Sequence, residues 1–132
     1  MKRKAQGDRA LIAGTSRQRG RWAESLALGH LLEQGLTLHA QNYQARCGEI
    51  DLILQDGDTI VFLEVRYRTD NLYMHALETI NARKCDRIIK TSLHYLQKHR
   101  AASKKTCRFD VIIIFGSVAT PSIRWIKNAF QA

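Results

Sequence analysis

The stretch GEIDLILQDGDTIVFLEVRYR, residues 48–68, decides the fold. Polar and apolar side chains alternate over residues 49–54, which is typical of a β-strand, and residues 59–68 are predicted to form the next strand. Between them, Asp56-Gly57 is a strong hairpin signal. We therefore predict two antiparallel strands joined by a tight turn.

The register of this hairpin brings acidic side chains together. If Asp56-Gly57 is the two-residue turn, Glu49 faces Glu64, and Asp51 is a diagonal neighbour of Glu64 on the same face. Such Cβ atoms lie about 5 Å apart across the strands and about 7 Å apart on the diagonal. Carboxylates at this separation suit Mg²⁺ or Mn²⁺, which can activate water for phosphodiester hydrolysis. The alternative is a row of surface ion pairs on an exposed sheet face.

Helices and further strands are predicted on both sides of the hairpin. They are a helix over 17–34 capped by Ser16, a strand over 36–43, a helix over 76–99, strands over 107–115 and 123–126, and a terminal turn over 128–130. The strand over 107–115 is almost continuously apolar, as expected of a strand covered on both faces. We expect one α/β domain over residues 17–132, preceded by a basic flexible arm at residues 1–16.

The charge is large and unevenly distributed. The chain of 132 residues has a net charge of +9, yet its acids are concentrated in the middle, between two basic segments. A basic chain attracts nucleic acid, and an acidic block inside it calls for a mediating cation. The composition favours metal-dependent chemistry on nucleic acid, with basic residues that serve only solubility as the alternative.

Composition also limits the location of the protein. The longest apolar run, residues 111–115, is far shorter than the roughly 18 residues of a membrane-spanning helix, so we expect no membrane partner. The 3 cysteines are scattered, which suits a reducing cytoplasm.

A basic stripe follows the second predicted helix. Its members, at spacings of three and four residues, are Arg83, Arg87, Lys90, His94 and Lys98. Residues at this spacing share one helix face, so we expect the stripe to contact backbone phosphates.

Four blocks of sequence together resemble a known family. They are residues 48–53, 61–68, 108–111 and 128–130. The blocks are similar to those of the YraN-like uncharacterised family, whose members resemble Holliday-junction resolvases and the wider PD-(D/E)xK nuclease superfamily. The resemblance covers about residues 17 to 130. It implies a restriction-endonuclease-like αβββαβ core with a mixed, helix-flanked sheet, Mg²⁺ or Mn²⁺ as cofactor, DNA as partner, and a homodimer by analogy with resolvases.

The same resemblance implies roles for single residues. It assigns Glu24, Asp51 and Glu64 to the metal, and Arg66 to the position of the usual catalytic lysine. Arginine stays protonated, so Arg66 can position groups and stabilise charge but cannot act as a base. Lys84, on the inward side of the second helix, could partly compensate; the commoner interpretation is a lysine that reaches solvent at the helix edge. Arg68 and Lys84 join the predicted nucleic-acid contacts.

Several assignments stay open. Glu49 is either a third ligand or a glutamate near a strand start, whereas for Asp110 we favour a structural hydrogen-bonding role. For Trp22 and Trp125 we favour the core over base stacking. The leading hypothesis is a nuclease for branched or non-canonical DNA in repair or recombination. The alternatives are a non-catalytic nucleic-acid-binding module with the same fold and a domain that binds an acidic protein.

Overall fold

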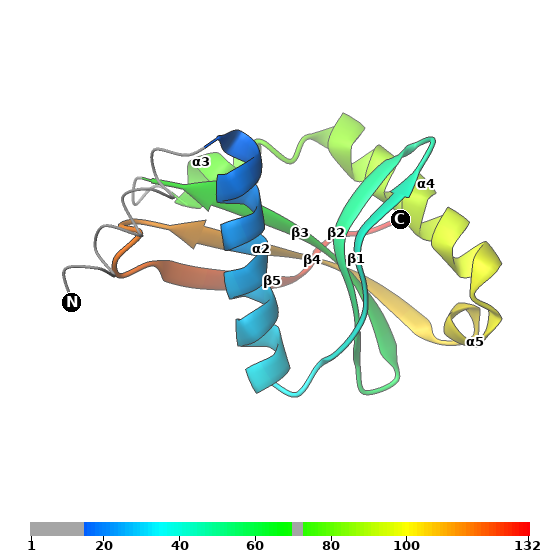
Figure 1. Cartoon of the computed structure of the whole chain (residues 1–132). Helices are drawn as coiled ribbons and strands as arrows, with labels where there is room; N and C mark the ends of the chain where they lie inside the picture. Colours follow the sequence, from blue (N-terminus) through cyan, green and yellow to red (C-terminus); the bar gives the residue numbers. More distant parts are fainter. Residues whose placement is uncertain (1–14, 70–72) are drawn as a thin grey trace.

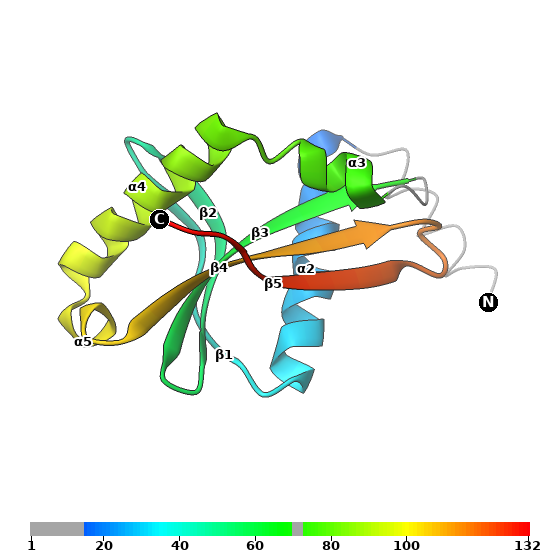
Figure 2. The same cartoon turned by 180° about the vertical axis from the view of Figure 1, so that it is seen from behind.

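The computed structural model describes residues 15–69 and 73–132, so residues 1–14 of the predicted basic arm lie outside the described part. A five-stranded sheet carries helices on both faces (Figures 1 and 2). The elements are α2 (Ser16–Glu33), β1 (Thr37–Ala45), β2 (Gly48–Asp56), β3 (Thr59–Arg68), α3 (Tyr73–Glu78), α4 (Ala82–Lys98), α5 (Arg100–Ser103), β4 (Thr106–Phe115) and β5 (Ser122–Phe130).

The sheet is mixed, with strand order β1-β2-β3-β4-β5. β3 and β4 are parallel, and every other neighbouring pair is antiparallel. The parallel pair requires a crossover, which α3 and α4 provide on the face opposite α2 (Figure 2). The order of helix, three strands, helix and strand confirms the predicted α/β class and is consistent with a restriction-endonuclease-like core.

Apolar side chains fill both interfaces between sheet and helices. Against α2, the core contains Ala23, Ala27, Leu31, Leu52, Leu54, Leu63, Ile112 and Ile114. Against α4, it contains Ile50, Ile53, Phe62, Ile88 and Tyr95. A smaller cluster of Ala76, Val111 and Ile113 lies under α3. β4 is thus buried on both faces, as its apolar sequence predicts.

Two predicted elements need correction. The helix predicted over 76–99 is two helices, because the Asn81 side chain accepts a hydrogen bond from Lys84 N at 2.9 Å and so begins α4 anew. The terminal turn predicted over 128–130 is wrong, since these residues belong to β5. At the start of α2, Thr15 caps the helix in place of Ser16, and Gln18 completes a capping box.

The register of the central hairpin also differs from the prediction. Asp56 pairs with Thr59, so the two turn residues are Gly57-Asp58, and Leu52 lies opposite Leu63. Gly57 has a φ of 60°, which suits a glycine at the first central position of a type II′ turn. The shift of two residues keeps the same side chains on the same face over the paired residues 52–56 and 59–63. It also brings Asp51, in place of Glu49, opposite Glu64 when the register is continued by one residue.

Candidate active site

A break in strand alternation creates the candidate site. Ile50 packs on the α4 side of the sheet, whereas Leu52, two residues on, packs on the α2 side. On the neighbouring strand β1, Asn42 has a φ of 50°, a left-handed conformation that asparagine tolerates better than most residues. The β1–β2 hairpin therefore exchanges the sides to which its two faces point at Asn42 and Asp51. Figure 1 shows β2 diverging from β3 in its upper part.

Asp51 lies where the two strands separate. The last backbone pair between β2 and β3 is Leu52 with Leu63. Beyond it, Asp51 Oδ2 accepts a hydrogen bond from Val65 N at 2.8 Å. The side chain thus takes the place of a backbone acceptor, and this bond fixes the carboxyl group between the strands.

Glu64 supplies the second carboxyl group and brings two cations with it. Its side chain is only 4% exposed, and Oε2 lies 3.1 Å from Arg66 Nη2 and 3.2 Å from Lys84 Nζ. Arg66 comes from the same strand, whereas Lys84 reaches across from the first turn of α4. A buried carboxylate needs such partners, because an unpaired charge in the protein interior is costly.

The two carboxyl groups interact directly with each other. Burial raises the pKa of Asp51 to about 9, and its hydrogen bond with Glu64 and the charge of Glu64 act in the same direction. The backbone N–H of Val65 opposes this shift, since it stabilises the ionised form. At neutral pH the pair therefore retains a proton between its oxygens, in a position where a divalent cation could replace it.

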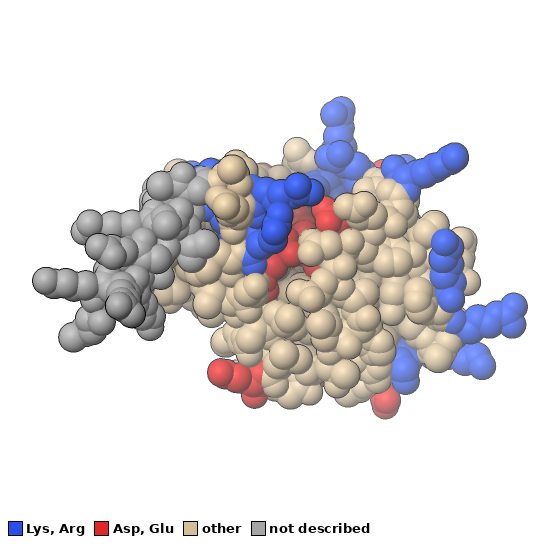
Figure 3. All heavy atoms as spheres, viewed as in Figure 1, with Lys and Arg blue, Asp and Glu red and all other residues tan. Residues whose placement is uncertain are grey.

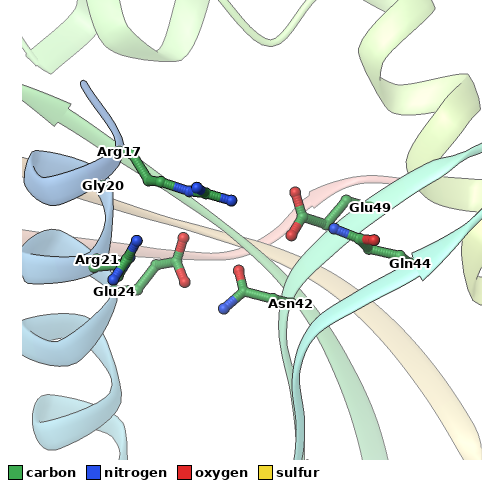
Figure 4. Close-up of a pocket in the computed structure, with 7 residues that line it drawn as sticks. All are labelled: Arg17, Gly20, Arg21, Glu24, Asn42, Gln44 and Glu49. Carbon is green, nitrogen blue, oxygen red and sulfur yellow. The ribbon is translucent and has the colours of Figure 1, made fainter. Parts of the chain in front are cut away.

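Glu24 approaches this pair from the other side of the sheet. It is half-buried on α2 and hydrogen-bonded to Asn42; burial raises the pKa of Glu24, as do the charges of Glu49 and Glu64. A cavity of about 400 Å³ lies beside it, lined by Arg17, Gly20, Arg21, Glu24, Asn42, Gln44 and Glu49 (Figure 4). In Figure 4, the Arg17 guanidinium extends toward the gap between Glu24 and Glu49. Figure 3 shows the same pattern at the surface, with recessed acidic atoms flanked by basic ones.

The arrangement of these acids differs from a preformed three-ligand site. Within residues 15–69 and 73–132, no three His, Cys, Asp or Glu side chains are grouped closely enough to hold a metal ion. Asp51 and Glu64 are in contact, whereas Glu24 is held by Asn42. Two carboxylates still fit Mg²⁺ or Mn²⁺, because such ions usually bind one or two carboxylates and take water and phosphate for the rest.

The predicted nucleic-acid contacts divide into two groups. Arg83, Arg87, Lys90 and Lys98 are exposed on α4, and Lys90 pairs with Asp86 at 3.0 Å. His94 is not part of this exposed row, because its Nδ1 hydrogen-bonds the Tyr43 hydroxyl at 2.7 Å. Arg68 lies elsewhere, at the end of β3 beside a second cavity.

Asp110 has the structural role favoured from the sequence. It is 0% exposed and accepts hydrogen bonds from Arg108 Nε, Trp125 Nε1 and Asn128 N, each at 2.9 Å for the nearest oxygen. Trp125 and Trp22 both pack against the core under α2, as predicted. Asp110 is therefore separate from the Asp51–Glu64 pair.

Sequence reasoning missed three contributions. Arg17 and Arg21 line the cavity beside Glu24, and their spacing of four residues on a predicted helix was the available signal. Asn42 gave no signal, because positive φ values cannot be read from one asparagine. The ion pair of Lys84 contradicts the preferred interpretation of a lysine that only reaches solvent.

Fold and site together define a class: an α/β domain consistent with a restriction-endonuclease-like core, with a buried carboxyl pair and two cations where β2 and β3 separate. Residues 23–114 match the family model described as "Uncharacterised protein family UPF0102", and the chain belongs to that family.

Curated relatives extend the match over most of the chain. A UPF0102 protein of Stutzerimonas stutzeri is 44% identical over 89% of this chain and 98% of its own length. One of Pseudomonas aeruginosa is 45% identical over 89% of this chain and 96% of its own length. One of Coxiella burnetii is 46% identical over 83% and 88%, respectively. In the part of the chain that is described, no helix is both long and apolar enough to span a membrane.

Proposed function

We propose that this protein is a metal-dependent nuclease that cuts branched or otherwise non-canonical DNA. The observation that carries the proposal is the contact of Lys84 Nζ with Glu64, 3.2 Å away, beside the carboxyl group of Asp51. Paired carboxylates can hold a divalent ion for phosphodiester hydrolysis, and the nucleases that the sequence resembles add a lysine beside them.

In this proposal, Lys84 supplies the amine that is missing from position 66. Arg66 cannot lose its proton, so it stabilises the charge that develops on the phosphate oxygens. Lys84 is half-buried and comes from α4, so it can orient the attacking water from the side of the helix. Arg66 on β3 and Lys84 on α4 would thereby divide between them the role that a single strand lysine has in the nucleases that the sequence resembles.

Asp51 and Glu64 would hold the Mg²⁺ or Mn²⁺ ion, with Glu24 close by. When bound, the ion would lower the pKa of a water molecule and neutralise phosphate charge. The hydrogen bond from Val65 N keeps Asp51 directed into the site, and the two ion pairs do the same for Glu64. These contacts fix both carboxyl groups before substrate arrives, which favours catalysis.

Substrate binding would rely on the surrounding cations. The net charge of +9 attracts a polyanion, and exposed Arg83, Arg87 and Lys90 extend from the site along α4. Arg17 and Arg21 contribute on the side of α2. Contacts of this kind bind backbone phosphates and do not read base sequence.

One observation favours a second candidate, a nucleic-acid-binding module without turnover. Glu64 Oε2 is engaged by both Arg66 and Lys84, which leaves it fewer lone pairs for a metal ion. If these ion pairs persist when substrate binds, the site would bind phosphates without cutting them.

The test is cleavage of labelled four-way junction, flap, single-stranded and duplex DNA with Mg²⁺, with Mn²⁺ and with chelator. We expect metal-dependent cutting of a branched substrate by the wild type and none by Asp51→Asn. Lys84→Met should lower the rate by about 100-fold or more, as loss of a general acid or base does. Lys104→Met is the control, because Lys104 is an exposed lysine at the end of α5, outside both the site and the basic row on α4, and it should cut at nearly the normal rate. Binding without cutting by the wild type and by Arg66→Lys would establish the binding module instead.

A further inference from the structure

A second cavity, of about 300 Å³, lies next to the candidate active site between α2, β3 and α3. The residues that matter here are Arg19, Gly20, Arg66, Tyr67, Arg68 and Thr79. Three arginines from two elements line this cavity, and all three are partly buried. The described residues that line it include no Asp or Glu. We call it the arginine cavity.

Two buried donors point to the kind of ligand. Among the described residues, the buried side-chain nitrogen and oxygen atoms without a hydrogen-bond partner are Arg66 Nε and Tyr67 OH. Both residues line the arginine cavity. Buried polar groups in folded proteins are nearly always paired, so two unpaired donors in one cationic cavity call for an anionic acceptor.

Tyr67 is held in place to donate. Its ring makes an edge-to-face contact with Trp22, with centroids 5.1 Å apart. Burial raises the pKa of Tyr67, against a smaller opposite effect of Arg19, so its hydroxyl keeps its proton at neutral pH. The hydroxyl is therefore a donor at a fixed position.

The arginine cavity and the cavity beside Glu24 meet at one residue of α2. Gly20 lines both of them. A Cβ atom added at Gly20 would have no heavy atom within 4 Å, so the surface above this turn of the helix is open. Arg66 connects the arginine cavity to the Asp51–Glu64 pair, because it lines this cavity while its Nη2 bonds Glu64. Glycine inside a helix lowers its stability, and at Gly20 the missing side chain leaves the surface between the two cavities open to a ligand.

We propose that the arginine cavity binds a backbone phosphate of the substrate strand, next to the scissile phosphate that a metal ion on Asp51 and Glu64 would hold, and that this strand crosses α2 over Gly20. The inference rests on the proposed function, because it names the path of the substrate to that site. Arg19 and Arg68 attract the phosphate through charge, and Arg66 Nε and Tyr67 OH bond its oxygens. The strand passes with its backbone against the helix at Gly20, where no side chain stands in the way.

The experiment compares two glycine variants of the same helix. Gly20→Gln places a neutral side chain on the proposed path, and Gly29→Gln places one on a part of α2 that is equally open and lines neither cavity. Glutamine is a better helix former than glycine, so both variants should fold and melt at or above the wild-type temperature. The probe is a short fluorescein-labelled single-stranded oligodeoxynucleotide, and binding is measured by anisotropy in chelator, where no cutting occurs.

We expect Gly20→Gln to weaken binding by about tenfold or more and Gly29→Gln to leave it unchanged. Tyr67→Phe, which keeps the ring against Trp22, should weaken binding by a few fold without changing its salt dependence. Equal affinity of both glycine variants would overturn the inference, as would a wild type that does not bind the probe. Cleavage is read separately, so wild-type cutting together with equal affinities would leave the proposed function standing and remove only this path.

Discussion

Asp51 and Asp110 are carboxylates at interior positions of the same sheet, yet their surroundings differ. Asp110 on β4 accepts hydrogen bonds from Arg108, Trp125 and Asn128, and the pKa of Arg108 is raised by its bond to Asp110. Asp51 on β2 has one backbone donor and faces another carboxyl group, that of Glu64.

The difference separates a structural role from a functional one. Trp125 and Asn128 donate to Asp110 from β5 and Arg108 donates from β4 itself, so the charge of Asp110 is matched within the protein. The carboxyl groups of Asp51 and Glu64 are in contact, and their like charges would destabilise the fold unless a proton or a cation lies between them. Groups that reduce the stability of a fold are commonly found at functional sites.

The largest expected effect is at Asp110. Asp110→Ala should destabilise the protein by about 3–5 kcal/mol, because it leaves the Trp125 and Asn128 N–H groups without their acceptor and leaves Arg108 with Asp56 as its remaining carboxylate partner. Denaturant unfolding followed by circular dichroism measures this loss. A change below about 1 kcal/mol would show that the network around Asp110 contributes little, and the comparison would fail on that side.

Asp51→Asn should act in the opposite direction. In chelator and at neutral pH, we expect the free energy of unfolding of this variant to exceed that of the wild type by about 1–3 kcal/mol. This range allows for solvent screening, because part of the Asp51 side chain reaches solvent. The folded protein keeps a proton on Asp51 that the unfolded chain releases, since the pKa rises from 3.8 to about 9 on folding. Wild-type stability should therefore fall as pH rises through this window, and the variant should show a flatter profile. Thermal unfolding across this pH range checks it; a less stable variant with an unchanged profile would contradict the assignment.

Asn42 and Asn128 allow a further comparison of the Asp51 and Asp110 sites, with smaller expected losses of stability. Asn42, beside Asp51, and Asn128, whose N–H bonds Asp110, have φ values of 50° and 53°. Replacing either by alanine should cost about 1–2 kcal/mol for the left-handed backbone, whereas glycine should cost less. Only the two Asn42 variants also remove the hydrogen bond to Glu24, so only they should lower cleavage. Unfolding and cleavage assays on the four variants test this, and equal losses of activity at both positions would contradict it.

The layers of the fold could be predicted because they follow from local patterns. The apolar run of β4 predicted a strand that is buried on both faces. The turn at Gly57 shows the limit, because an Asp-Gly pair flanked by a second aspartate allows two placements of the turn one residue apart, which shift the strand register by two residues. Both placements bury the same side chains, so periodicity cannot choose between them.

The site could be predicted in its residues but not in its pairings. The motif gave Asp51, Glu64 and Arg66, yet the position of Lys84 depends on where α4 starts, which Asn81 decides through its side chain. The approach of Glu24 depends on the backbone at Asn42. The start of α4 and the position of Glu24 thus depend on single polar residues, Asn81 and Asn42, which leave no trace in the hydrophobic pattern.

Binding of Mn²⁺, measured by electron paramagnetic resonance, tests the central claim most directly. If the Asp51–Glu64 pair is a cation site, the wild type should bind Mn²⁺ saturably, and both Asp51→Asn and Glu64→Gln should lose this binding while remaining folded. Asp86→Asn, which removes an exposed carboxylate on α4, should bind like the wild type. Saturable binding that survives Asp51→Asn, or a wild type that binds no Mn²⁺, would contradict the account.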